Sequence, residues 1–473
     1  MTNTRITFYG GINEIGGNKF LLEDRGARVF LDFGRNFSRE KQYFDEPWIS
    51  PRKEDHLLAL GILPNLERIY RKDASGDPGL DAVLLTHPHT DHYDSIRWLR
   101  SDIPAYSTAT TKAVILAREF SGSPGPTKEY HIADWTKEEG QQVYRPLETF
   151  EPGRPVRVAG LETTGFQVDH SVLGSVGYVI ETEGGNVAYT GDFRLHGARG
   201  AQTQQFLQKA AEHEPAALLI EGTHVTESKI ESEDEVERKV TAVVEATRGL
   251  AVAGFAPADV DRLNTFHKVA VATDRMLIMT EKQAFMLHQL TSQSLFGEFD
   301  LRSRNVLIFK KERARSTHYL DLLQDEYGGK VVEAKDVKAM QERAILVAAL
   351  TDMLAMPDID PMPGSVYILS SSEPFNEEME ISYDKLMGWL TRYGLPVFQV
   401  HASGHATAHD LRQAVETIRP KKVFLVHTDN PDLYARFLEK LGFERAAVLR
   451  NFVTDPKGHP HNLVILLYPL STS

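Results

Sequence analysis

The sequence predicts an α/β protein built in two parts, and three observations lead to this prediction. From Ile6 to Glu221, short apolar strands and glycine-rich turns dominate, with helices expected after residues 92 and 201. From about residue 233 the chain alternates helix with strand, which indicates a parallel, doubly wound sheet. The run from Thr86 to His92 places three imidazoles and one carboxylate directly after an apolar strand, where α/β folds display their chemistry.

The elements of the first part follow from local patterns. Asp81 to Thr86 is an apolar run that predicts a buried strand, and Tyr93 to Arg100 predicts the start of a helix. Arg28 to Leu31 predicts a further strand, which ends at Asp32. The histidine-rich run therefore lies in a loop between a strand and a helix.

In the second part, the apolar residues indicate helices and strands in turn. The expected elements are helix Val236 to Ala246, strand Leu250 to Ala253, helix Val260 to Ala272, strands Met276 to Met279, Val306 to Phe309 and Val366 to Leu369, and helix Glu377 to Tyr393. Beyond them, a helix from Asp432 to Leu441 and a strand from Leu463 to Leu467 are expected to close the fold.

The run from Thr86 to His92 has the composition of a site for two metal ions. Its pattern is H-x-H-x-D-H, in which neutral imidazole nitrogens and a carboxylate oxygen suit zinc or manganese. A solvated histidine-rich loop is the plainer interpretation, but four ligand-type residues at this spacing disfavour it. The chain contains no cysteine, which excludes disulfides and thiolate metal sites.

This motif resembles the signature of the metallo-β-lactamase superfamily, whose fold is an αββα sandwich of two β-sheets flanked by helices. Downstream, His170 resembles the third-motif histidine, and Asp192, within Tyr189-Thr190-Gly191-Asp192-Phe193, resembles the bridging aspartate. Asp32 matches the first-motif aspartate, which usually supports the site without binding metal.

Three further motifs resemble those of the β-CASP nucleases. They are Leu218 to His224, with Glu221 as the acid of motif A, Gln399 to Ala406, with His405 in motif B, and Val423 to His427, similar to motif C. Together with Gly10 to Asn18, they point towards the ribonuclease J family. Because motifs B and C follow the alternating region, we place an inserted β-CASP domain at 226–395, between the metallo-β-lactamase segments 1–225 and 396–473.

The resemblance implies a role for each of these residues. One metal ion would be held by His87, His89 and His170, a second by Asp91, His92 and His427, and Asp192 would bridge both. His405, oriented by Glu221, would protonate the leaving oxygen or stabilise the developing charge, and Asp32 would support the site. The cofactors implied are two divalent cations, zinc, manganese or both.

Ribonuclease J proteins hold a 5′-phosphate in a pocket of serine- and glycine-rich turns. The counterparts expected here are Ser370, Ser371, Ser403 and Gly404, whose hydroxyl and backbone N–H groups could bind an anion without net positive charge. The alternative is that Ser370 and Ser371 belong to an ordinary polar turn.

Charge does not by itself favour a nucleic-acid partner. The 473-residue chain has 53 basic and 66 acidic residues, a net charge of −13, so phosphate binding must depend on local patches and on the metals. The segment from Arg302 to Arg315 is one such basic patch, and a solvated face is an equal alternative. No apolar run suggests a membrane span, and we expect a cytoplasmic protein.

The expected function is two-metal hydrolysis of nucleic acid, with RNA favoured over DNA and 5′-to-3′ exonuclease action favoured, endonuclease action remaining open. A DNA exonuclease or repair nuclease is the nearest alternative, because nothing in the motifs demands a 2′-hydroxyl. A catalytically silent scaffold is the alternative from another class, and the complete set of ligands argues against it. A monomer and a homodimer both remain open.

Overall fold

The computed structural model describes residues 4–45, 49–73, 75–122, 133–135, 142–226, 231–313, 317–371, 377–440 and 463–467. The chain folds into two compact units. The first comprises Met1–Leu195, Arg199–Lys229 and Gly404–Ser473, and the second comprises His196–Ala198 and Ile230–Ser403. The second unit is thus inserted into the first. The chain re-enters the first unit at Gly404, whereas the sequence predicted the return at residue 396.

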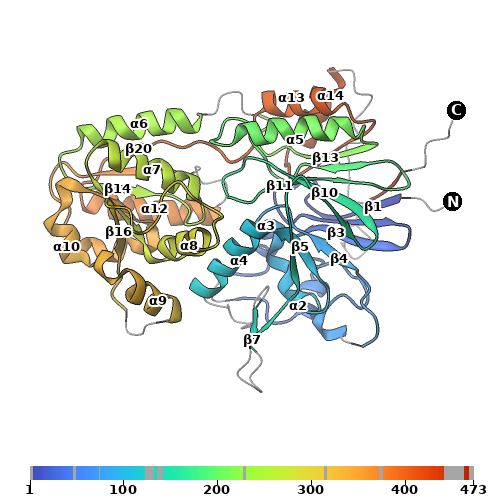
Figure 1. Ribbon diagram of the computed structural model, residues 1–473, viewed down its shortest axis with the longest axis horizontal. Coiled ribbons are helices and arrows are strands. Elements are labelled where there is room, and N and C mark those ends of the chain that lie inside the picture. The colour runs from blue at the N-terminus through green and yellow to red at the C-terminus, as the bar shows by residue number, and fades with distance from the viewer. Residues whose placement is uncertain are drawn as a thin grey trace. The chain divides into compact units, whose positions relative to one another are not determined.

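Two β-sheets form the centre of the first unit (Figure 1). One contains, in spatial order, β22 (Leu463–Leu467), β1 (Thr4–Gly10), β2 (Lys19–Asp24), β3 (Ala27–Phe33), β4 (Ala82–Leu84), β5 (Ala105–Thr108) and β8 (Leu147–Phe150). The other contains β21 (Val423–Val426), β13 (Ala217–Glu221), β12 (Val187–Tyr189), β11 (Val176–Ile180), β10 (Leu161–Gln167) and β9 (Pro155–Val158). A separate pair joins β6 (Ala133–Trp135) to β7 (Gln142–Tyr144).

The two sheets pack face to face through a core that takes side chains from both. The Phe20 ring lies 5.5 Å from Tyr189, and the Phe8 ring lies 6.4 Å from Phe424. Separate apolar clusters join the outer faces of the sheets to flanking helices and loops. The helices of this unit are α1 (Phe37–Glu40), α2 (Glu54–Ala59), α3 (Thr90–Tyr93), α4 (Ala109–Ser121), α5 (Gly200–Glu212), α13 (Ala408–Ile418) and α14 (Pro431–Lys440). The predicted αββα sandwich is confirmed.

The helix expected from Tyr93 to Arg100 forms differently. The chain makes one α-turn, α3, and continues as a 3₁₀-helix from Asp94 to Trp98. Ser95, Ile96 and Trp98 of this 3₁₀-helix are buried, and the chain becomes extended at Leu99. This stretch is thus a shorter and more tightly wound helix than the sequence predicted.

The second unit is built on one sheet with helices on both faces. Its strands are, in spatial order, β17 (Val331–Val332), β16 (Val306–Phe309), β15 (Met276–Thr280), β18 (Ala344–Val347), β14 (Ala251–Gly254), β19 (Val366–Leu369) and β20 (Val397–Gln399). Every neighbouring pair is parallel. The helices are α6 (Glu233–Ala246), α7 (Val260–Ala272), α8 (Glu281–Ser292), α9 (His318–Tyr327), α10 (Ala334–Ala339), α11 (Met356–Ile359) and α12 (Glu377–Arg392).

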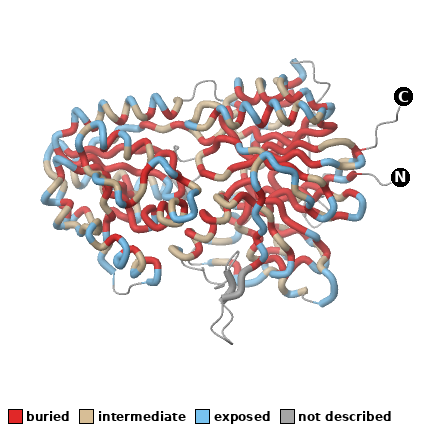
Figure 2. Tube along the Cα trace, in the orientation of Figure 1, coloured by how far each residue is buried: buried red, intermediate tan, exposed pale blue. Residues whose placement is uncertain are grey.

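This arrangement matches the alternation of helix and strand in the sequence. The central strands are buried on both faces, as Figure 2 shows by its colouring, and their residues are almost all apolar. Strand β18, in the middle of the sheet, was not predicted, because its four apolar residues run on into Ala348, Ala349 and Leu350 without a boundary signal. Among the described residues, no helix combines the length and apolar character that crossing a lipid bilayer requires.

Lys19, on β2, is an unusual member of the first unit's interior. Its side chain is fully buried, and its ammonium group donates to the carbonyl oxygen of Gly34 at 2.5 Å. Burial, with a smaller contribution from the charge of Arg39, lowers the pKa of Lys19 to about 8 from its ordinary value of 10.5. The folded protein therefore releases this proton at a lower pH than the unfolded chain does.

This difference predicts that the charge of Lys19 lowers the free energy of unfolding by its full amount below pH 8. The effect disappears as the pH rises to 10.5. Relative to Lys19→Met, the wild type should gain about 3 kcal/mol of stability between those limits. The measurement is denaturation of both proteins at several pH values. A difference that stays constant with pH would contradict the assigned pKa.

Candidate metal centre

The residues of the predicted site come from the carboxyl ends of strands in the first unit. Strand β4 runs parallel to β3, and β13 runs parallel to both β12 and β21. The loops after β3 and β4 therefore leave one edge of their sheet, and those after β12, β13 and β21 leave one edge of the other. This topology brings together side chains that are far apart in the sequence.

Backbone hydrogen bonds from neighbouring segments fix the position of the histidine-rich run. Asn18 N donates to the carbonyl of Asp91 at 3.1 Å, and Arg35 N donates to that of Thr90 at 2.9 Å. A Cβ atom at Gly34 would overlap the Asp91 carbonyl, so only glycine allows this close approach. The loop geometry thus depends on the glycine-rich segments that flank β2 and β3.

Three imidazoles form the first ligand group. His89 Nδ1 lies 3.1 Å from His87 Nε2 and 3.0 Å from His170 Nε2. His170 Nδ1 donates to the carbonyl of Gly404 at 2.5 Å, so Nε2 of the neutral ring carries the lone pair. His87, His89, His170 and Asp192 each place one ligand atom within 4.8 Å of the others.

The second ligand group contains Asp91, His92 and His427. Asp91 Oδ2 lies 3.0 Å from His427 Nε2 and 3.7 Å from His92 Nε2. His427 follows β21 with a left-handed φ of 51°, a conformation that non-glycine residues rarely adopt outside functional sites. The ligand atoms of this group also lie within 4.8 Å of one another.

Asp192 lies between the two groups. Its Oδ2 is 3.2 Å from His92 Nε2, 3.7 Å from His87 Nε2 and 3.8 Å from the nearest ring nitrogens of three further histidines, His170, His405 and His427. This is the place that a carboxylate bridging two ions would occupy.

Asp32 supports one of the rings. It is fully buried at the end of β3, and its Oδ2 lies 2.8 Å from His92 Nδ1 and accepts a hydrogen bond from the Tyr189 hydroxyl at 2.7 Å. Oδ1 accepts from Thr86 N at 2.8 Å. Because Asp32 binds the Nδ1–H of His92, Nε2 is the ring nitrogen that faces Asp91 and Asp192 and that a bound cation would contact.

The electrostatics of the site suit cations. Burial, reinforced by neighbouring imidazoles, holds the pKa of His87 and of His170 well below the usual range, and burial together with Arg118 lowers the pKa of His89 to about 3. These three rings are therefore neutral near pH 7. Burial opposes ionisation of Asp192 and Asp91, yet the imidazoles around them hold both pKa values below the usual range.

Around His92 the balance favours positive charge. Burial would lower the pKa of His92, but the carboxylates of Asp192, Asp91 and Asp32 overcome this effect and raise it well above the usual range. Neutral imidazole lone pairs beside ionised carboxylates form a donor set that fits divalent metal ions. The protein therefore has the ligands of a divalent metal site, as its H-x-H-x-D-H motif predicted.

Glu221 and His405 form a pair beside Asp192. Glu221 is fully buried at the end of β13, with Oε2 3.1 Å from His405 Nδ1 and Oε1 accepting from Phe193 N at 3.1 Å. Burial would lower the pKa of His405, but the charge and hydrogen bond of Glu221 raise it to about 9. His405 stacks on the His427 ring at 5.5 Å.

The residues expected to bind a 5′-phosphate have other contacts. The Ser370 hydroxyl is buried in the second unit, where it donates to the carbonyl of Val400 at 2.7 Å and accepts from Arg262 Nη1 at 2.5 Å. The Ser403 carbonyl accepts from His196 Nε2 at 2.9 Å. In the first unit, Gly404 supplies the carbonyl that orients His170. Ser371, which is half-buried, follows Ser370. The phosphate pocket stays a prediction.

The basic segment from Arg302 to Arg315 is largely neutralised within the second unit. Four of its side chains pair with acids: Arg302 with Glu326, Lys310 with Glu333, Lys311 with Asp352, and Arg313 with Glu281. Arg315 lies outside the described residues. Most of the described basic side chains of this segment thus form ion pairs, which favours a solvated surface over a phosphate-binding patch.

Three side chains with evident roles in the site were not assigned from the sequence. Asn18 Nδ2 lies 3.0 Å from His92 Nε2, and the hydroxyls of Thr86 and Thr223 lie 3.0 Å and 2.8 Å from Nδ1 of His87 and His427. Thr86 directly precedes His87, and Thr223 is two residues after Glu221. Their position inside the motifs was the signal that could have identified them from the sequence.

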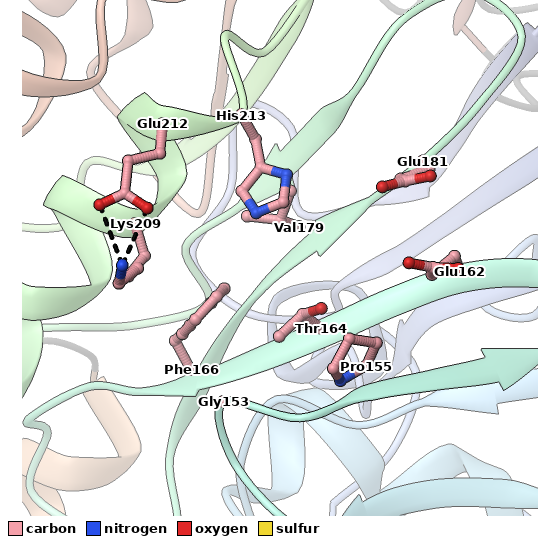
Figure 3. A pocket seen from close by; sticks show the side chains of 10 residues that line it. All are labelled: Gly153, Pro155, Glu162, Thr164, Phe166, Val179, Glu181, Lys209, Glu212 and His213. Atoms are coloured by element: carbon pink, nitrogen blue, oxygen red, sulfur yellow. Dashed lines mark hydrogen bonds and ion pairs between the residues drawn. The ribbon is translucent and has the colours of Figure 1, made fainter.

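A cavity of about 270 Å³ lies elsewhere on the first unit (Figure 3). Residues of β9, β10 and β11 and the end of α5 line it, and they include the ion pair of Lys209 with Glu212 at 2.8 Å. None of the predicted ligands lines it. The candidate site is therefore located by the convergence of the predicted metal ligands and not by this cavity.

Comparison with known proteins agrees with the motifs. Residues 62–258 match a family described as a beta-lactamase superfamily domain, and residues 395–446 match a Zn-dependent metallo-hydrolase RNA specificity domain. The chain is similar to ribonuclease J of Mycoplasma pneumoniae, with 23% identity over 90% of this chain and 68% of the relative. It is also similar to ribonuclease J 2 of Streptococcus pyogenes, with 23% identity over 93% and 73%.

A crystal structure of a protein of unknown function from Enterococcus faecalis has the same fold, with a TM-score of 0.73 and 20% identity, over 98% of this chain and 100% of that one. The two domain matches include the histidine-rich run, His170, Asp192, Glu221, His405 and His427, whereas Asp32 and the segment from Gly10 to Asn18 precede the first match. The chain is a metallo-β-lactamase protein of the β-CASP, ribonuclease J-like group.

Proposed function

We propose that this protein is a metal-dependent nuclease that hydrolyses RNA phosphodiester bonds. The observation that carries the proposal is the convergence of seven ligand-type side chains, with the Glu221–His405 pair beside Asp192. The ligands proposed are His87, His89 and His170 for one ion, Asp91, His92 and His427 for another, with Asp192 shared. Ribonuclease J relatives and the match to an RNA specificity domain support RNA as the substrate.

Two divalent cations in such a site supply activation of a water molecule and neutralisation of the phosphoryl oxygens. The protein's own contribution is the protonation of the leaving 3′ oxygen. Glu221 binds Nδ1 of His405, so the transferable proton is held at Nε2, on the opposite side of the ring. The Glu221 carboxylate keeps His405 protonated before transfer and stabilises its orientation.

The decisive experiment compares matched RNA and DNA. Purified protein with Mn²⁺ or Zn²⁺ is incubated with RNA and DNA strands of the same sequence, labelled at one end. We expect RNA to be cleaved at least about tenfold faster, because the relatives are ribonucleases. His405→Ala, purified in parallel, controls for contaminating nucleases. Faster cleavage of DNA would favour a DNA exonuclease, and absence of cleavage with both ions bound would favour a silent scaffold.

The direction of degradation gives a second prediction. If Ser371, Ser403 and Gly404 contribute to a pocket for one terminal phosphate, 5′-monophosphorylated RNA should be degraded from its 5′ end faster than 5′-triphosphorylated RNA, by about tenfold or more. The buried hydrogen bonds of Ser370 argue against its hydroxyl taking part. Time courses of product length would check this. Internal cuts that precede release of mononucleotides would instead indicate endonuclease action.

Three finer properties belong to the same proposal. Imidazole and carboxylate ligands suit zinc and manganese alike, and metal analysis of protein purified without chelators distinguishes them. The absence of cysteine from the chain and the ribonuclease J relatives support a cytoplasmic location. A homodimer is the expected assembly to test, by light scattering of the purified protein.

A further inference from the structure

Two carboxylates of the site share the same arrangement of partners. Asp32 Oδ2 lies 2.8 Å from His92 Nδ1 and accepts from the Thr86 hydroxyl at 2.8 Å, and that hydroxyl lies 3.0 Å from His87 Nδ1. Glu221 Oε2 lies 3.1 Å from His405 Nδ1 and accepts from the Thr223 hydroxyl at 2.7 Å. The Thr223 hydroxyl in turn lies 2.8 Å from His427 Nδ1.

The direction of each hydrogen bond follows from the inventory of protons. A threonine hydroxyl has one proton, and in both cases it is donated to the oxygen of a buried carboxylate. The hydroxyl oxygen can then only accept, so the neighbouring histidine must carry its proton on Nδ1. In both His87 and His427, Nε2 is then the nitrogen that faces the other ligands.

We propose that Thr223 and Thr86 are positioning residues, each of which links a buried carboxylate to a second imidazole through hydrogen bonds of its hydroxyl group. Glu221 holds His405 directly and His427 through Thr223, and Asp32 holds His92 directly and His87 through Thr86. The inference rests on the proposed ligand roles of His427 and His87. It also means that one buried acid, Glu221, orients both a metal ligand and the proposed proton donor.

Of the two threonines, Thr223 should matter more for the position of its histidine, His427. His427 has a left-handed backbone conformation, which non-glycine residues rarely adopt, and it follows β21, whereas Asp91, its nearest ligand partner, lies in α3. Thr223 also lies 3.3 Å, through its hydroxyl oxygen, from the carbonyl of His427. Strand pairing explains the meeting, because Glu221 is in register with Val426, the residue before His427.

The test is binding of Zn²⁺ to metal-free protein, measured by calorimetry or by competition with a chelator. Thr223→Val removes the hydroxyl and keeps the shape, and we expect it to weaken one of two bound ions by about 10- to 100-fold, the usual effect of losing a partner to a metal-binding histidine. Thr223→Ser keeps the hydroxyl and should restore affinity to within about threefold. Thr86→Val and Thr86→Ser should behave in parallel for the other ion.

Thr163 provides a matched control. It is fully buried in β10 of the same unit, and its hydroxyl has no hydrogen-bond partner within the described part of the chain. Thr163→Val should therefore leave Zn²⁺ affinity unchanged. Melting temperatures of all variants separate loss of metal from loss of fold, and Thr223→Ala replaces Thr223→Val if the latter does not fold.

Each outcome has one meaning. Wild-type affinity in Thr223→Val and Thr223→Ala, or an equal loss in Thr223→Ser, would overturn the inference, because the hydroxyl would then not be the responsible group. A loss in Thr223→Val that Thr223→Ser restores supports it, whether or not the wild type cleaves RNA. Failure of the wild type to cleave RNA would overturn the proposed function alone.

Discussion

Asp192→Asn is expected to abolish hydrolysis, lowering kcat/KM by more than about 10³-fold, while the protein stays folded. Asp192 Oδ2 lies within 3.8 Å of ring nitrogens from five histidines, so the substitution removes the charge shared by both ligand groups. Asparagine keeps the shape of the side chain, so we expect the fold to be retained. Asp91→Asn should have a comparable effect through the second ligand group.

The measurements are kcat/KM on RNA, metal content per chain and the melting temperature. Asp274→Asn is a suitable control, because it removes the same charge from a side chain that is 98% exposed. We expect the control to match the wild type and both active-site variants to bind fewer than two ions. A fully active wild type with at most one metal ion per chain would refute the two-metal mechanism.

His405→Ala is expected to keep both metal ions and to lose about 10²- to 10⁴-fold in rate, the range for removal of a positioned general acid or base. Its contacts explain the expectation: Nδ1 of His405 lies 3.1 Å from Glu221 Oε2, whereas its distance to the shared Asp192 Oδ2 is 3.8 Å. The ring can therefore be removed without taking the closest partner from any proposed ligand.

His427→Ala should behave in the opposite way. Its Nε2 lies 3.0 Å from Asp91 Oδ2, so its removal should lower occupancy of one ion, and the rate should recover in part at high metal concentration. Metal analysis beside rate measurements over a range of Mn²⁺ concentrations distinguishes the two variants. Loss of metal from His405→Ala but not from His427→Ala would reverse the proposed roles.

Much of this protein follows from local sequence. Apolar runs predicted strands such as Asp81 to Thr86, and the alternation after residue 233 predicted the parallel sheet, because burial on both faces requires continuous apolar residues. Four ligand-type side chains within the run from His87 to His92 predicted the metal site, because imidazole and carboxylate groups gathered in one loop supply part of the ligand set of a divalent cation.

Other features depended on contacts that no local pattern contains. The expected helix at Tyr93 forms one α-turn and continues as a 3₁₀-helix, and the hydrogen bonds of Ser370 depend on Arg262 and Val400, which are distant in the sequence. Four basic side chains between Arg302 and Arg313 pair with acids that lie on α8, on α9 and further along the chain. Charge in a sequence does not show which charges will pair.

The sequence by itself determined the ligand types, the strands that carry them and the fact of an inserted domain. Only the tertiary structure decided which nitrogen of each ring faces the centre, since that depends on partners such as Asp32, Gly404 and Thr223 on other segments. The physical reason is strand register. Pairing Glu221 with Val426 sets Thr223 beside His427, and a shift of one residue would separate them while leaving every motif unchanged.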